Sequence, residues 1–307
     1  MTTDADGIVA RRRLRRWLAF WRVSALVVGA ALVLAVVAVV TDFDPIADRP
    51  HILRVTVSGI VFDDPSILGG LEQAAEDDAT RALLVIIDTP GGTTTGGESI
   101  YRELRRISEN GTPVVAVIRT VGASAGYMVA LAADRIYALE TSITGSIGVL
   151  LETAEVSKLL DRLGVSAETF RSAPLKGQPS LFQPLDERTR VATQSLIDDV
   201  YDWFLEVFAE RRGLPVETAR GLADGRAYTG RQALSLNLID SIGGEREALA
   251  WLVETQGIPG DTPVIDLERD DNPETFFDLV TGLAKKTLLS ERLRLDGLMS
   301  VWHPGEN

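Results

Sequence analysis

The sequence predicts an α/β protein built on a mostly parallel β-sheet and preceded by one N-terminal transmembrane helix. After Pro50, short β-branched runs alternate with segments of helical periodicity. This alternation is typical of βαβ units around a buried parallel sheet. A long uncharged stretch before Pro50 predicts the membrane helix. With 307 residues and 45% apolar content, the chain has room for one large domain or two small ones.

The predicted transmembrane segment covers residues 23–41. From Val23 to Thr41 there are 19 consecutive uncharged residues, which make about 28 Å of helix, enough to cross a bilayer. Six arginines precede this segment and three aspartates follow it. The positive-inside rule therefore places residues 1–22 in the cytoplasm and the remainder outside it. A cleaved signal peptide is the alternative, but its apolar region is normally shorter and ends at a small-x-small site. We therefore expect a single-pass protein of the cell membrane.

The main domain is expected to cover residues 50–268. Its first part carries four predicted strands, at Ile52–Val57, Ala82–Ile87, Val114–Ile118 and Arg135–Ala138. Three helices are predicted among them, at Ser66–Asp77, Gly97–Glu109 and Ser124–Ala132. Active sites of such folds gather at the carboxyl ends of the strands.

A long helix is predicted from Asp186 to Arg212, and shorter helices follow it. The long helix has a broad apolar stripe, which indicates a core or subunit-contact face. The shorter helices are predicted at Pro215–Leu222, Arg231–Leu236 and Arg246–Gln256. Residues 269–307 are expected to form a charged linker and an amphipathic C-terminal segment from Phe276 to Trp302.

Composition excludes several kinds of chemistry. The chain has no cysteine, which excludes thiol nucleophiles, disulfides and thiolate metal sites. Its two histidines, His51 and His303, lie outside any motif, so a His-based triad is disfavoured. No HExxH pattern occurs, and we expect neither metal nor cofactor. The net charge is −13, and residues 1–22 hold six arginines against two aspartates, so residues 23–307 carry −17. This charge disfavours nucleic-acid binding.

A glycine turn follows the second predicted strand, in the run Asp88-Thr89-Pro90-Gly91-Gly92. Glycines between a strand and a helix let backbone N–H groups approach a ligand closely, as an oxyanion hole requires. The alternative is that the turn only connects the strand to the helix.

A serine follows the third predicted strand, in the run Gly122-Ala123-Ser124-Ala125-Gly126-Tyr127. A serine in a tight turn between a strand and a helix can project its Oγ towards a substrate, and the helix dipole favours developing negative charge. The alternative is that Ser124 only caps the helix.

Two further features follow, Thr144-Gly145-Ser146-Ile147-Gly148 and Lys176. A lone lysine is usually a solvated charge. A lysine that acts as a general base must be neutral, and lowering a lysine pKa from about 10.4 towards 7 costs roughly 4–5 kcal/mol. Burial and a hydrogen bond from a hydroxyl can do this, and Ser146 is the candidate donor.

Taken in order, the motifs DTPGG, ASAGYMVALAADRIYA, TGSIGV, a lysine and DGRAYTGRQALSLNLID resemble the signal peptide peptidase A (SppA) family of bacterial serine–lysine peptidases. The resemblance extends from about Ile52 to Val253. It implies a ClpP/crotonase-like α/β superhelix, assembled into ring-shaped homo-oligomers whose sites face an enclosed apolar chamber.

The resemblance also implies roles for individual residues. Ser124 matches the nucleophile, and Lys176, 52 positions later, matches the general base. Ser146 matches the residue that hydrogen-bonds the lysine amine. Gly91 matches a backbone donor of the oxyanion hole, and the N–H of Ala125 is the candidate for the second donor.

The chain departs from the family pattern at two positions. Ala125 stands where the family often has glycine directly after the nucleophile. Phe170-Arg171-Ser172-Ala173 is similar to a Tyr-Lys-Ser-Ala motif that carries the base in some longer members, but arginine cannot usefully lose its proton. The 52-residue spacing and the run Phe182-Gln183-Pro184-Leu185 favour Lys176 as the base.

The function implied by the resemblance is a serine endopeptidase that cleaves apolar peptides, specifically signal-peptide remnants in or near the membrane. A close alternative is a peptidase that cuts stomatin-like or misassembled membrane proteins. A crotonase-like acyl-CoA enzyme is a rival that predicts cytoplasmic placement and CoA binding. A third reading is a silent scaffold with a capping Ser124 and a solvated Lys176.

Overall fold

The computed structural model describes residues 17, 20–32, 49–267 and 299–301. Met1–Arg49 and Pro50–Asn307 form two separate units. Residues 20–32 are helical, and residues 33–41 of the predicted transmembrane segment lie outside the described residues. Within the described ranges, no helix combines the length and apolar character that a membrane crossing requires. The predicted linker and C-terminal amphipathic segment also lie outside them, apart from residues 299–301.

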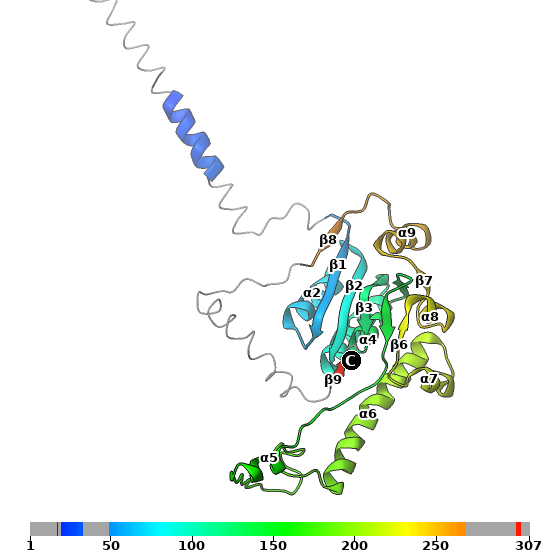
Figure 1. Ribbon diagram of the computed structural model, residues 1–307. Helices are drawn as coiled ribbons and strands as arrows, with labels where there is room; N and C mark the ends of the chain where they lie inside the picture. Colours follow the sequence, from blue (N-terminus) through cyan, green and yellow to red (C-terminus); the bar gives the residue numbers. More distant parts are fainter. Residues whose placement is uncertain (1–16, 18–19, 33–48, 268–298, 302–307) are drawn as a thin grey trace, which may run out of the picture. The chain divides into compact units, whose positions relative to one another are not determined.

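The larger unit contains one mixed, mostly parallel β-sheet (Figure 1). Its central strands are β1 (His51–Val61), β2 (Thr80–Thr93) and β3 (Val114–Ala123), which pair in parallel in that order. β3 pairs in parallel with two strands in succession: Val115–Ile118 pair with β4 (Arg135–Ala138), and Val121–Ala123 pair with β5 (Ile143–Gly145).

Short strands complete the sheet. β7 (Ser241–Ile242) lies parallel to β4, and β8 (Val264–Asp266) lies parallel to β1. β6 (Ala227–Thr229) is antiparallel to β5, and β9 (Met299–Val301) is antiparallel to the end of β2.

Helices cover both faces of the sheet. The helices are α2 (Pro65–Glu76), α3 (Thr94–Glu109), α4 (Ala125–Ala130), α5 (Ser157–Arg162), α6 (Glu187–Arg212), α7 (Val216–Leu222), α8 (Gly230–Ser235) and α9 (Glu245–Gln256). Alternate residues of β2 face opposite sides, as the pleat requires. Leu83, Val85 and Ile87 join the larger core with α2, α3 and α4, whereas Leu84 and Ile86 join a second core with α9. Residues 82–87 of β2 are therefore buried on both faces, which is why this run is apolar throughout.

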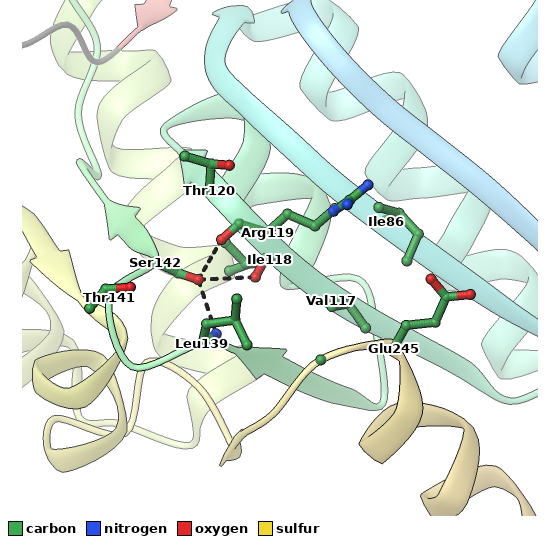
Figure 2. A pocket seen from close by; sticks show the side chains of 10 residues that line it. Ile86, Val117, Ile118, Arg119, Thr120, Leu139, Thr141, Ser142 and Glu245 are labelled. Carbon is green, nitrogen blue, oxygen red and sulfur yellow. Dashed lines mark hydrogen bonds between the residues drawn. The ribbon is translucent and has the colours of Figure 1, made fainter.

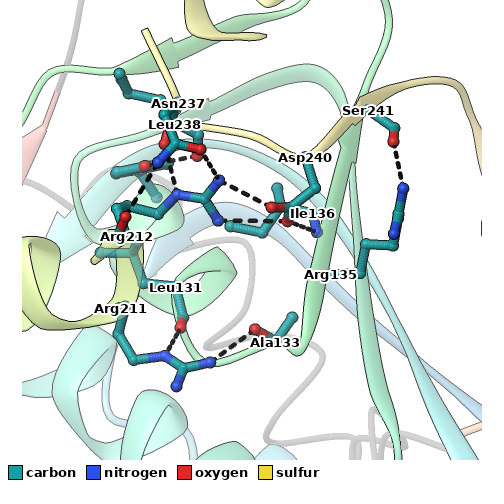
Figure 3. Close-up of polar contacts among 11 residues, drawn as sticks. Leu131, Ala133, Arg135, Ile136, Arg211, Arg212, Asn237, Leu238, Asp240 and Ser241 are labelled. Atoms are coloured by element: carbon teal, nitrogen blue, oxygen red, sulfur yellow. Dashed lines mark hydrogen bonds and ion pairs between the residues drawn. The ribbon is translucent and has the colours of Figure 1, made fainter. Parts of the chain in front are cut away.

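Two arginines at the end of α6 fix the position of α4 and β4 (Figure 3). Arg211 donates hydrogen bonds to the carbonyls of Leu131 and Ala133, just after α4. Arg212 donates to the Asp240 carboxylate at 2.9 Å, and the same carboxylate accepts the N–H of Ile136 in β4. These contacts attach the end of the longest helix to the helix that follows Ser124.

The structure confirms the predicted α/β class, the four predicted strands and the seven predicted helices to within a few residues. β2 and β3 both run further than predicted, through their glycine-containing ends. α4 begins at Ala125, so Ser124 precedes the helix. The short elements α5 and β5 to β9 were not predicted.

Candidate active site

Ser124 occupies a constrained turn between β3 and α4. Its backbone has φ 58° and ψ −119°, and a positive φ is uncommon for a residue other than glycine and is concentrated at functional sites. The Ser124 N–H donates to the carbonyl of Gly145 at 2.8 Å, and the residue is 1% exposed. Its side chain makes no capping hydrogen bond to α4. A capping role therefore does not explain this serine.

The turn depends on the small residue two positions after Ser124. A Cβ atom added to Gly126 would lie 2.5 Å from Cγ2 of Thr89, a distance that real Cβ contacts do not show. Glycine at this position therefore lets the first turn of α4 pack directly on the end of β2. Ala125 is fully buried in the same packing.

Ser124 follows β3, and Ser146 follows the neighbouring strand β5. Ala123 pairs with Gly145 in the parallel ladder between β3 and β5, so the two serines leave the sheet at adjacent positions. Ser146 also has a positive φ, 49°, and its N–H donates to the carbonyl of Arg226 at 2.9 Å. The structure thus brings the Ser124 and Ser146 turns together at the carboxyl ends of parallel strands.

Gly91 belongs to the extended end of β2, at the same edge of the sheet. Its φ is 122°, in the region that favours glycine. Its N–H donates to the hydroxyl of Thr89 at 3.0 Å, and that buried hydroxyl also lies within hydrogen-bond distance of the Gly59 and Gly91 carbonyls. The Gly91 N–H therefore points at a side chain in this conformation, and its oxyanion role stays a prediction.

Thr89 is a residue of this site that no sequence motif indicated. Its hydroxyl organises the Gly91 turn, and its methyl group contacts the position of Gly126. The only signal in the sequence is its place in the DTPGG run, between the strand and the glycines.

Lys176 lies in a long excursion between β5 and α6, which contains α5 and extends beside the start of α6 (Figure 1). Residues 148–188 include no buried residue, and Lys176 itself is exposed. Ser124 and Ser146, by contrast, are both buried. Arg171, the other candidate position for a base, donates to the side chain of Gln183 at 2.9 Å in the same excursion.

His51 lies at the opposite end of the sheet from Ser124. It begins β1, where it is paired with Thr80 at the start of β2, and its ring contacts the Thr80 hydroxyl at 3.3 Å. Ser124 follows the last residue of β3, which runs parallel to these strands. A triad of His51 with Ser124 is therefore ruled out, and His303 lies outside the described residues.

A cavity of about 420 Å³ opens elsewhere, between β3, the β4–β5 connection and the start of α9 (Figure 2). Its serine is Ser142, whose Oγ accepts the N–H of Leu139 at 3.0 Å and contacts the carbonyls of Ile118 and Arg119. The contacts of the Ser142 hydroxyl therefore stabilise the connection between β4 and β5. The cavity is lined by none of the predicted catalytic residues.

The fold and the Ser124 turn place the protein among the serine hydrolases, because a serine in a sharp turn between a parallel strand and a helix is the arrangement of the nucleophile in that class. The sequence matches the profile of peptidase family S49 over residues 106–258, a range that includes Ser124, Ser146 and Lys176.

Three relatives are similar over most of the chain. A Synechocystis sp. protein that bears a protease name is 37% identical over 76% of this chain and 84% of that protein. A protein of Enterococcus faecium named for signal peptide peptidase, SppA, is 31% identical over 83% of this chain and 75% of that protein. The chloroplastic serine protease SPPA of Arabidopsis thaliana is 30% identical over 75% of this chain but only 34% of that protein. The chain therefore belongs to peptidase family S49, the SppA family, and is a serine peptidase.

Proposed function

We propose that this serine peptidase is a membrane-anchored endopeptidase that uses Ser124 as nucleophile and Lys176 as general base to cleave apolar peptides. The observation that carries the proposal is the Ser124 turn, which is buried, has a positive φ and makes no capping bond. Signal peptides that remain in the membrane are the proposed substrates. The name of the Enterococcus faecium relative supports this substrate class, and the uncharged residues 23–41 support the anchor.

The proposed reaction proceeds through an acyl-enzyme. Neutral Lys176 takes the proton of Ser124, and Oγ attacks the peptide carbonyl carbon. Backbone N–H groups of the Gly91 turn and of Ala125 stabilise the oxyanion. Lys176 then gives its proton to the leaving amine, and water hydrolyses the ester to release the acyl product. Ser146 hydrogen-bonds the lysine amine and orients it towards Ser124.

We further propose that a neighbouring copy completes the site, as part of a ring-shaped homo-oligomer with the ClpP/crotonase-like superhelix of the family. Two observations support this. Lys176 is exposed in the single chain, and the excursion that carries it exposes large apolar side chains, including Leu163 at 66% and Phe170 at 92%. An exposed apolar patch of this kind usually marks an interaction surface. A second copy that covers this surface would bring Lys176 to a Ser124 across the interface.

The dyad is tested by hydrolysis of an apolar peptide with wild-type protein and with single variants. Ser124→Ala and Lys176→Ala should each lose about a thousandfold or more in kcat, since the dyad acts as a unit. Arg171→Ala serves as the matched control in the same excursion and should keep activity. Hydrolysis by Lys176→Ala at the wild-type rate would remove Lys176 as the base.

Sharing of the site between copies is tested by mixing. Ser124→Ala and Lys176→Ala chains, co-expressed in one assembly, should regain activity that neither has alone. Absence of any recovery, in assemblies shown to contain both chains, would place both residues of each site in one chain.

The proposed topology has its own test. In sealed inside-out vesicles, residues 50–307 should be protected from added protease, because the vesicle lumen corresponds to the extracytoplasmic side. Digestion of the domain in intact vesicles of this orientation would overturn the assignment.

A further inference from the structure

The cavity of about 420 Å³ combines apolar and charged surfaces. Its apolar side chains are those of Ile86 and Val117, which are buried in the core that packs against α9, and of Leu139, which is 50% exposed. Its polar side chains come from β3, from the β4–β5 connection and from the start of α9. An apolar surface with a few polar groups is typical of a small-molecule site.

Two side chains of opposite charge line the cavity, Arg119 from β3 and Glu245 from the first residue of α9. Figure 2 shows both charged groups on the same side of the cavity, away from Ser142. One oxygen of Glu245 accepts a hydrogen bond from Arg54 at 2.8 Å, and Arg54 also donates to the Asp266 carboxylate. Among the residues that the structure describes, the Arg119 guanidinium has no hydrogen bond or ion pair. The cavity therefore offers a cation and an anion side by side, and the cation is available to a ligand.

An apolar α-amino acid is the ligand class that these walls fit. Its carboxylate would pair with Arg119, since a guanidinium can bind a carboxylate through two parallel hydrogen bonds. Its ammonium group would pair with Glu245, and its side chain would lie on the apolar surface. One carbon atom separates the two charges of an α-amino acid, so both can reach charged groups on one side of a cavity. Amino acids of this kind are also the end products when apolar peptides are degraded.

The cavity lies against the two segments that lead into the serine turns. Arg119–Thr120 lie five and four residues before Ser124, and Thr141–Ser142 lie five and four residues before Ser146. A hydroxyl of the second segment contacts two carbonyls of β3, so the two segments are joined at the cavity wall. A ligand in the cavity would therefore contact the strand end that carries the nucleophile.

The strand end is held on its β2 side by a side chain. Residues 119–121 of β3 stand opposite the single residue Asp88, where the register of the ladder with β2 shifts. One Asp88 oxygen accepts the N–H of Val121 at 3.2 Å, and the other lies 3.4 Å from the Thr120 hydroxyl. Because these contacts stand in place of ladder hydrogen bonds, a ligand that takes the Thr120 hydroxyl would loosen the strand just before Ser124.

We propose that this cavity is an effector site for an apolar α-amino acid, and that its occupation slows the reaction of Ser124. The ligand carboxylate accepts hydrogen bonds from Arg119 and Thr120 and draws the Thr120 hydroxyl away from Asp88. A ligand shifts a protein between two arrangements only if it binds them with different affinity, and this exchange of partners supplies the difference. The effect on rate rests on the proposed function, because it takes Ser124 as the nucleophile, whereas binding of the amino acid does not.

Binding is tested by isothermal titration calorimetry of L-leucine into the full-length protein in detergent. The matched ligands are leucinamide, which lacks the carboxylate, and isocaproate, which lacks the ammonium group. Each should bind at least about tenfold more weakly than leucine, because each loses one charged contact. Equal affinities for the three ligands, or the absence of leucine binding, would overturn the site.

Variants of two exposed arginines give an independent comparison. Arg119→Met removes the guanidinium but keeps the apolar stem, and it should weaken leucine binding by at least about tenfold. Arg81→Met is the matched control, because Arg81 is an exposed arginine near the start of β2, at the end of the sheet opposite Ser124, and it should keep the wild-type affinity. Equal affinities of Arg119→Met and wild type would contradict the proposal, and the ligand series on wild type decides it even if Arg119→Met does not fold.

The effect on the reaction is measured with an apolar peptide substrate. Saturating leucine should lower kcat about fivefold with KM nearly unchanged, because the effector does not occupy the peptide site. The effect should disappear in Arg119→Met and remain in Arg81→Met. An unchanged kcat would overturn the effector role, and so would a rise in KM alone, because it would show that leucine competes at the active site as a product.

Ser124→Ala separates this proposal from the proposed function. It should bind leucine with the wild-type affinity, so the cavity can be judged apart from the nucleophile. If leucine does not bind the wild-type protein, loss of labelling by a peptidyl fluorophosphonate in Ser124→Ala would still support the nucleophile. Labelling of Ser124→Ala at the wild-type rate would overturn the proposed function, while leucine binding that requires Arg119 would still support the site.

Discussion

At the scale of single residues, Thr89 and Gly126 determine the geometry around Ser124. The Thr89 side chain is buried, with its hydroxyl on the Gly91 turn and its methyl group against the start of α4. One side chain therefore couples the proposed oxyanion turn to the nucleophile turn. Neither residue needs to contact a substrate to have this effect.

Removal of the Thr89 hydroxyl should destabilise the domain. Thr89→Val keeps the shape of the side chain but leaves the Gly91 N–H without its acceptor, at an expected cost of about 1–3 kcal/mol in the free energy of unfolding. Thr89→Ser keeps the hydroxyl and should cost less. Urea unfolding followed by circular dichroism measures both, and equal stabilities of the two variants would contradict the role given to the hydroxyl.

Crowding between Thr89 and position 126 should appear as coupling between mutations. Gly126→Ala places a Cβ 2.5 Å from Thr89 Cγ2 and should cost about 1–3 kcal/mol. Thr89→Ser removes Cγ2, so the double variant should lose less stability than the sum of the single losses. A double-mutant cycle by urea unfolding measures this coupling, and strict additivity would show that the methyl group is not the obstacle.

At the scale of secondary-structure elements, α6 packs in the core on one face of the sheet and α9 packs in the core on the other. The end of α6 is attached through Arg212, whose side chain is 8% exposed, to Asp240. Glu247 caps the start of α9, because its carboxylate accepts the Gly244 N–H at 2.8 Å. The first attachment is an ion pair whose aspartate side chain is 29% exposed, and the second is a hydrogen-bonded cap whose glutamate side chain is 37% exposed.

Loss of the Arg212 guanidinium should lower the free energy of unfolding. Arg212→Met keeps the apolar stem but leaves the Asp240 carboxylate without its cation, and the expected cost is about 3 kcal/mol. Arg226→Met is the matched control, because its ion pair with Asp224 is largely exposed and such pairs contribute about 1 kcal/mol or less. Similar losses in urea unfolding of the two variants would show that burial of the pair does not matter.

The cap of α9 should make stability depend on pH. The hydrogen bond from the Gly244 N–H, followed by the contact with Arg246, lowers the pKa of Glu247 below its ordinary value of 4.5. A lowered pKa in the folded state means that the contribution is present above pH 4.5 and is lost as the pH falls through the folded value. Glu247→Gln keeps an acceptor at every pH, so its stability relative to wild type should rise as the pH falls from 7 to 3. A constant difference in urea unfolding over this range would contradict the prediction.

At the scale of the whole molecule, the excursion between β5 and α6 is the part that a single chain leaves uncovered. Its residues 148–186 include no buried residue, and Leu196 in the first half of α6 is also exposed, at 60%. The apolar stripe of α6 predicts a core or subunit-contact face. The structure assigns its second half to the core through Phe204 and Phe208, which leaves the first half for the proposed contact between copies.

Charges placed on this surface should prevent assembly. Leu163→Glu combined with Phe170→Glu should lower the mass measured by light scattering in detergent and abolish peptide hydrolysis. Lys158→Glu is the control, since it changes the charge of the same excursion without removing an apolar contact. An unchanged mass for the double variant would exclude this surface from the interface.

The sequence predicted the central strands and helices well because their apolar patterns are long and regular. It underestimated β2 and β3, since glycines and proline normally end a strand, whereas here Gly91 and Gly92 are still paired. It missed β5 to β9 because strands of two or three residues carry no detectable periodicity.

Part of the site was also accessible from sequence. The Ser124 turn lies between a predicted strand and a predicted helix, whereas its adjacency to the Ser146 turn was not predicted, because β5 is too short to be recognised. The role of Thr89 was not accessible, because it depends on a contact between segments far apart in the chain. In the proposed assembly, the environment of Lys176 depends on the surface of a second chain, which no local sequence pattern could predict.

The division of β3 between two partners has a mechanical consequence. Val115–Ile118 of β3 pair with β4, while Val121–Ala123 pair with β5. The turns of Ser124 and Ser146 therefore both follow the paired ends of β3 and β5. In the proposed assembly, a neighbouring copy would contact the excursion, which begins only after Ser146. The spacing of the Ser124 and Ser146 turns would then be set by the pairing of β3 with β5 and not by that contact.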